Sequence, residues 1–112
     1  MSFHIEELQK IQESTEGFFR KNLRSEIAQK IRTFDQYVNQ IKSADGAQRE
    51  QLIKKYLEIA QGMRHSALAL GATNAKDPKW AAASVVESWL CLLRSGNNTE
   101  ISIGEKIINQ MR

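Results

Sequence analysis

The side chains in this sequence that are best suited to act as nucleophiles or metal ligands are one cysteine and two histidines. Cys91 lies within a run of leucines, whereas a reactive thiol needs a partly exposed, electropositive setting that favours the thiolate. We therefore expect a buried structural cysteine. His4 and His65 are far apart in the sequence, and only His4 with Glu7 has a one-turn helical spacing that could give two metal ligands. Two ligands at one spacing are a very weak signal for a metal site.

Motifs for metal, nucleotide or cofactor chemistry are absent from the sequence. A carboxylate-bridged metal centre in a helical bundle uses Glu-x-x-His patterns on paired helices, and none occurs here. The glycines belong to no Walker-type or dinucleotide fingerprint. We therefore predict a protein that is not an enzyme and that uses no cofactor or metal.

Basic side chains give the one candidate for phosphate contact. They are Arg20, Lys21, Arg24, Lys54 and Lys55. The chain carries 16 basic and 13 acidic residues, a net charge of +3, which permits a polyanionic partner without requiring one. Glu16 and Glu26 dilute the cluster, and no recognition-helix or RNA-binding signature accompanies it. We expect a solvated helix surface and keep nucleic-acid binding as the alternative.

The elements that must position these side chains are helical. Between residues 18 and 41 apolar side chains recur at steps of three and four, which places them on one face of a helix. They are Phe19, Leu23, Ile27, Ile31, Phe34, Val38 and Ile41. An earlier helical stretch has Ser2 placed as its cap. Because a glycine inside a helix costs about 1 kcal/mol relative to alanine, Gly17 leaves two alternatives open, one helix over about 3–42 or a break near 14–17.

A second long helix is predicted between Asp45 and Gly71. Asp45, followed three residues later by Gln48, is an acidic variant of the capping box, and Gly71 is well placed to end the helix. The predicted buried side is Leu52, Ile53, Tyr56, Leu57, Ile59, Ala60, Met63, Ala67, Leu68 and Leu70.

The third helix is predicted from Pro78 to about Arg94, with Asp77 as its cap. Apolar residues cover nearly its whole circumference, whereas an ordinary surface helix has one apolar stripe. It is therefore either the central helix of the fold or part of an oligomer interface. Trp80 and Trp89 are two and a half turns apart and lie on roughly opposite sides. We expect either that one faces the core and the other a second subunit, or that the core buries both. The candidate interface residues are Trp80, Val86, Trp89 and Leu93.

A short final helix is predicted to begin with the capping-box pattern of Ser102 and Glu105, after a loop at Asn97 and Asn98. The fold class is therefore all-α, a small bundle of three or four major helices plus a short C-terminal helix. At 112 residues we expect one domain, 1–112. The polar connection over 73–77 offers a place for recognition, although we favour a plain surface connector.

The composition indicates a general class of function but not a biological process. The start of the chain lacks the pattern of an export signal, the most apolar stretch, 80–93, is shorter than the ~20 residues that cross a bilayer, and the single cysteine suits a reducing compartment. We predict a cytoplasmic, non-catalytic protein-interaction module, such as an adaptor, regulator or inhibitor, with a homodimer as one form. Nucleic-acid association and small-molecule binding in the bundle core are the alternatives.

Overall fold

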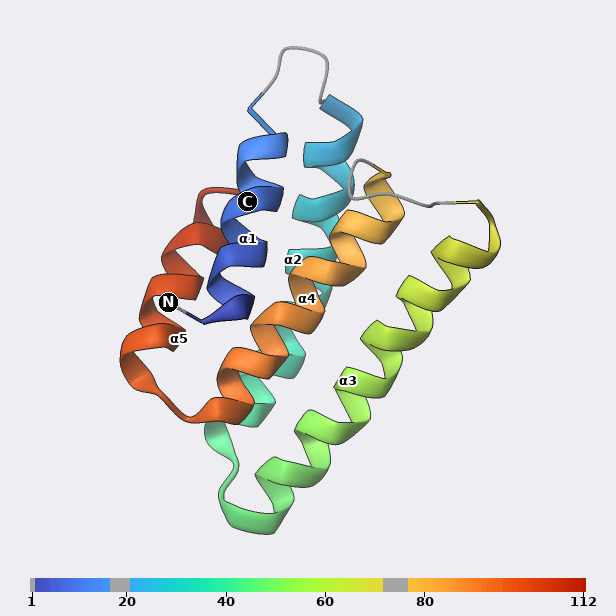
Figure 1. Cartoon of the computed structure of the whole chain (residues 1–112). Coiled ribbons are helices and arrows are strands. Elements are labelled where there is room, and N and C mark those ends of the chain that lie inside the picture. The colour runs from blue at the N-terminus through green and yellow to red at the C-terminus, as the bar shows by residue number, and fades with distance from the viewer. Residues whose placement is uncertain (1, 17–20, 72–76) are drawn as a thin grey trace.

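The computed structural model describes residues 2–16, 21–71 and 77–112, and all regular structure in them is helical. The helices follow one another with short connections (Figure 1). They are α1 (Phe3–Ser14), α2 (Lys21–Ser43), α3 (Gly46–Ala69), α4 (Pro78–Ser95) and α5 (Asn98–Asn109). The all-α prediction is confirmed. The described residues contain no strand.

Helix α4 is the centre of the fold. The other four helices all pack against it, α2 and α3 most extensively (Figure 1). Twelve of its 18 residues are buried, including the small residues Ala81, Ala82 and Ala83, which allow neighbouring helices to approach closely. Of the two explanations for its apolar circumference, the structure bears out a central helix.

The ends of α4 form as the sequence predicts. Asp77 caps the start, because its Oδ1 accepts hydrogen bonds from the backbone N–H groups of Lys79 at 3.0 Å and Trp80 at 3.4 Å. Pro78 occupies the first turn, where its missing N–H is no loss. Gly96 ends the helix with a φ of 70°, a left-handed conformation that suits glycine.

The first two helices are separate. Ser2 caps α1 as predicted, since its hydroxyl accepts a hydrogen bond from the N–H of Ile5 at 3.2 Å. Helix α1 ends at Ser14, and the N–H of Thr15 bonds back to the carbonyl of Gln12 at 2.9 Å. The break is therefore the correct alternative, although Gly17 and Phe19 lie outside the described residues. The described part of the predicted apolar face of α2 is buried in full.

Two predicted helix starts need correction. The carboxylate of Asp45 stands at the cap position of α3 but makes no capping hydrogen bond, so the acidic capping box does not form. Helix α5 begins at Asn98, four residues before the predicted start at Ser102, because the side chain of Asn97 accepts a hydrogen bond from the N–H of Glu100 at 3.1 Å. Asparagine is among the best N-cap residues, and this signal outweighs Ser102.

The burial prediction for α3 is wrong at three positions. Ile59, Leu68 and Leu70 are 44%, 43% and 79% exposed, although all three were assigned to its buried side. Along the last three turns of α3 only Ala60 and Ala67 are fully in the core. The physical reason is that the carboxy-terminal half of α3 stays packed on α4 through its alanines but moves away from α2, which leaves the α2-facing side of this half uncovered (Figure 1).

Ion pairs join two pairs of neighbouring helices, α2 with α5 and α3 with α4. Lys42 at the end of α2 pairs with Glu105 of α5 at 2.7 Å, and Arg64 of α3 pairs with Glu87 of α4 at 2.9 Å. Each ion pair of this kind at the surface contributes at most about 1 kcal/mol to the free energy of unfolding. Apolar packing around α4 is therefore the main source of stability.

Candidate interaction groove

A second apolar stripe runs along α3 beside its core-facing side. Its members recur at alternating steps of four and three residues, the spacing with which one helix packs along another. They are Leu52, Tyr56, Ile59, Met63 and Leu70, and the polar Ser66 occupies the remaining position of the same spacing. We call this set the α3 stripe.

The first half of the α3 stripe is covered by α2. Tyr56 is buried and stacks on Tyr37, with ring centroids 4.3 Å apart and an interplanar angle of 18°. The Tyr56 hydroxyl hydrogen-bonds to Oε1 of Gln40 at 2.7 Å. These contacts close the seam between the last turns of α2 and the first turns of α3.

The second half of the α3 stripe is not covered. Beyond Ile59 the stripe continues through Met63, which is half-buried, to Leu70, the most exposed large apolar side chain in the described residues. A hollow of about 450 Å³ opens here between the two helices, with Glu26 and Lys30 of α2 on its opposite side. Apolar side chains of α3 thus line this hollow and are not covered by side chains of α2.

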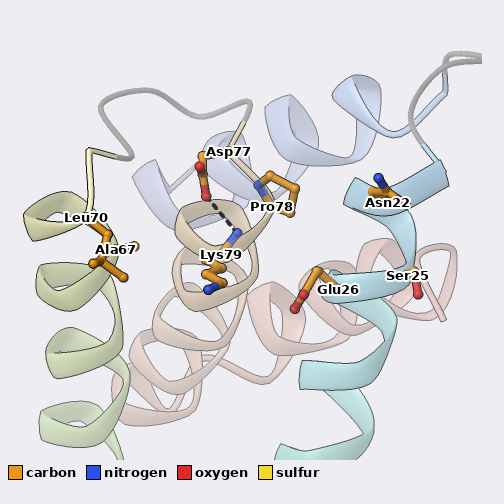
Figure 2. A pocket seen from close by; sticks show the side chains of 8 residues that line it. All are labelled: Asn22, Ser25, Glu26, Ala67, Leu70, Asp77, Pro78 and Lys79. Carbon is orange, nitrogen blue, oxygen red and sulfur yellow. Dashed lines mark hydrogen bonds between the residues drawn. The ribbon is translucent and has the colours of Figure 1, made fainter.

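The hollow continues to the start of α4. A neighbouring cavity of about 440 Å³ shares Glu26, Ala67, Leu70 and Lys79 with the first, so the two form one channel, which we call the α2–α3 groove. Figure 2 shows Ala67 and Leu70 on α3, Glu26 on α2, and Lys79 between them on the first turn of α4. The groove combines an apolar wall with charged groups of both signs.

The metal-ligand and thiol candidates of the sequence have the following surroundings in the described residues. No group of three His, Cys, Asp or Glu side chains in the described part of the chain is placed to hold a metal ion. Cys91 is buried, and desolvation raises the pKa of its thiol, a shift that the nearby Arg94 only partly opposes. A thiol with a raised pKa stays protonated at neutral pH, which agrees with the prediction of a structural cysteine.

The predicted interface residues lie mostly inside the molecule. Val86, Trp89 and Leu93 are at most 2% exposed, and only Trp80 of the four is partly accessible. The indole N–H of Trp89 is buried without a hydrogen-bond partner. Because these three side chains are enclosed by helices of the same chain, the surface available to a partner lies elsewhere.

The predicted phosphate-contacting residues do not form one patch. Lys21 and Arg24 are exposed at the start of α2, and Arg20 lies outside the described residues. The hydrogen bond between Tyr56 and Gln40 places Lys54 and Lys55 beside the other end of α2. Sixteen residues of helix separate Arg24 from Gln40, about 24 Å at 1.5 Å per residue. Lys54 and Lys55 therefore lie far from Arg24 along α2, and the described basic side chains do not form a single cluster.

Comparison with known protein families, curated proteins and solved structures found no match. Function must therefore be argued from the geometry of this chain. No helix in the described residues is long and apolar enough to span a membrane. The predicted connector over 73–77 lies outside the described residues except for Asp77, which caps α4.

The sequence analysis missed the α2–α3 groove. The available signal was the regular four–three spacing from Leu52 to Leu70, which overlaps the core-facing residues of the same helix. Two overlapping stripes make nearly the whole helix look buried. Only the divergence of α2 and α3 shows which of the two stripes is buried along its whole length and which becomes exposed.

Proposed function

We propose that this protein is a non-catalytic protein-interaction module that self-associates through the α2–α3 groove. The supporting observation is the uncovered half of the α3 stripe, where Met63 and the exposed Leu70 line a channel between two helices and Ile59 is exposed one turn before Met63 on the same stripe. Helix-in-groove recognition uses apolar anchors at this spacing. The groove accepts the carboxy-terminal half of α3 from a second copy of the chain.

Charge supports a second copy as the occupant. Glu26 and the two lysines Lys30 and Lys79 line the same groove. A rim with both signs is self-complementary under a two-fold axis, because the acid of each copy can meet a base of the other. A uniformly basic rim would repel a second copy and favour an acidic partner instead.

Apolar composition also suits an isologous contact. The exposed side chains Ile59 and Leu70 belong to the helix that forms one wall of the groove. Each copy therefore supplies both a ridge and a channel. Stable interfaces bury about 800 Å² per partner, and a contact limited to half a helix falls at the lower end of that range. We expect reversible dimerisation that depends on protein concentration.

The experiment is light scattering coupled to size-exclusion chromatography over a series of protein concentrations. The wild-type chain should pass from monomer to dimer as its concentration rises. The double variant Ile59→Asp/Leu70→Asp should remain monomeric, because it places two charges in the apolar contact. Circular dichroism should show that its helix content is unchanged.

Phe3→Asp is the matched control. Phe3 is 70% exposed on α1, so this change also replaces an exposed apolar side chain by a charge, but away from the groove. It should leave the dimer intact. A wild-type chain that is monomeric at every concentration would overturn the proposal, as would equal loss of the dimer in both variants.

A further inference from the structure

A second cleft lies on another side of α2 and shares only Ser25 with the α2–α3 groove. Three of its α2 residues, Arg24, Ala28 and Arg32, follow at steps of four and therefore share one helix face. The carboxy-terminal residues Gln110 and Arg112 form the opposite side of a hollow of about 320 Å³. The small side chain of Ala28 leaves space between the two α2 arginines. We call this site the arginine cleft.

Arg112 is held in place by two neighbours. Its Nη1 and Nη2 atoms donate to the two carboxylate oxygens of Asp35 at 2.7 and 2.9 Å, and its Nε donates to Oδ1 of Asn109 at 2.8 Å. The hydrogen bond with Asp35 raises the pKa of Arg112 further above that of a free guanidinium. A guanidinium fixed in this way needs little reordering to meet a ligand.

The other two arginines retain their full positive charge. No ion pair joins Arg24 or Arg32 to another residue of the described ranges, and both side chains are exposed. The residues that line the cleft include no acid. With Asp35 neutralising Arg112, the cleft has a net charge of about +2, concentrated on the α2 side.

We propose that the arginine cleft binds a ligand that carries two linked phosphate groups. Guanidinium groups bind phosphate oxygens through paired, charge-assisted hydrogen bonds. Arg24 and Arg32 start eight residues apart, about 12 Å along the helix axis, and their long side chains must reach toward each other over Ala28 for each to contact one phosphate of a bridged pair. Ser25, next to Arg24 in the sequence, also lines the cleft and carries a hydroxyl that can donate. Its arginines line no part of the α2–α3 groove, although Ser25 borders both sites.

The test is isothermal titration of the full chain with inorganic pyrophosphate, with orthophosphate in parallel. Pyrophosphate should bind more tightly than orthophosphate, and Arg24→Gln/Arg32→Gln should weaken its binding at least about tenfold. The control Lys54→Gln/Lys55→Gln removes the same charge from exposed positions near the other end of α2. It should leave the affinity for pyrophosphate nearly unchanged at moderate salt.

Each other result has a defined meaning. Absence of pyrophosphate binding by the wild-type chain would overturn the proposal, and so would equal weakening in the two double variants, which would show unspecific attraction. A single-stranded oligonucleotide serves as the second ligand. If it binds more tightly than pyrophosphate and depends on the same two arginines, the cleft holds linked phosphates and their source is a nucleic-acid backbone.

Discussion

The two halves of α3 belong to one helix but have different surroundings. The first half buries the large side chains Ile53, Tyr56 and Leu57 and is joined to α2 by stacking and a hydrogen bond. The second half buries only alanines and leaves Ile59 and Leu70 exposed. Apolar residues thus continue beyond the part of the helix that the fold covers. The second half therefore contributes less apolar burial to the monomer, and we propose that it serves contact with a second copy of the chain.

Burial explains why the two halves of α3 contribute differently to the stability of the fold. Removal of apolar surface from water stabilises a fold by about 25 cal/mol per Å². A fully buried isoleucine gains nearly all of this stabilisation on folding, whereas Leu70, 79% exposed, gains little. Most of the hydrophobic free energy of Leu70 is therefore still available for association.

The largest expected effect comes from the covered half. Ile53 is 1% exposed, so Ile53→Ala removes buried methyl groups and leaves a cavity, at a cost of about 2 to 5 kcal/mol in the free energy of unfolding. Urea denaturation followed by circular dichroism measures this loss. A loss below about 1 kcal/mol would mean that the first half is as loosely packed as the second.

An intermediate effect is expected at the seam between α2 and α3. Tyr56→Phe keeps the ring stack but removes the hydroxyl that bonds to Gln40, so the free energy of unfolding should fall by about 0.5 to 1.5 kcal/mol. Tyr37→Phe is the control, because no hydrogen bond joins the Tyr37 hydroxyl to another described residue. Equal losses in the two variants would show that the hydrogen bond does not help to close the seam.

The smallest effect on folding is expected in the uncovered half. Leu70→Asp should change the free energy of unfolding by no more than about 0.5 kcal/mol when measured on the monomer at low concentration. The same variant should weaken self-association. A large loss of monomer stability would instead identify Leu70 as a fold residue and remove the distinction between the two halves.

Local signals predicted much of the fold. Asp77 and Pro78 mark the start of α4, because an N-cap depends only on residues a few positions apart in the sequence. The apolar stripe of α2 from Leu23 to Ile41 was also predicted correctly. The start of α5 was misassigned because Asn97 and Ser102 are both capable caps. A choice between two such caps depends on how the helix packs against the bundle.

The sites were harder to predict because they depend on tertiary geometry. The α2–α3 groove exists because α3 diverges from α2 beyond Ile59, and no local spacing encodes that angle. The arginine cleft joins Arg24 and Arg32 to Arg112 at the other end of the sequence. The sequence analysis included Arg24 in a different cluster, since proximity along the chain was the only guide to proximity in space.

The most direct test of groove-mediated association is methyl NMR of the chain labelled with ¹³C at its methionine methyl groups. Met63 lies half-buried in the groove, whereas Met111 is buried near the carboxy terminus. If two copies associate through the groove, the Met63 resonance should shift with protein concentration while that of Met111 stays constant. Concentration-dependent association with an unchanged Met63 resonance would contradict the account, because the contact would then lie on another surface.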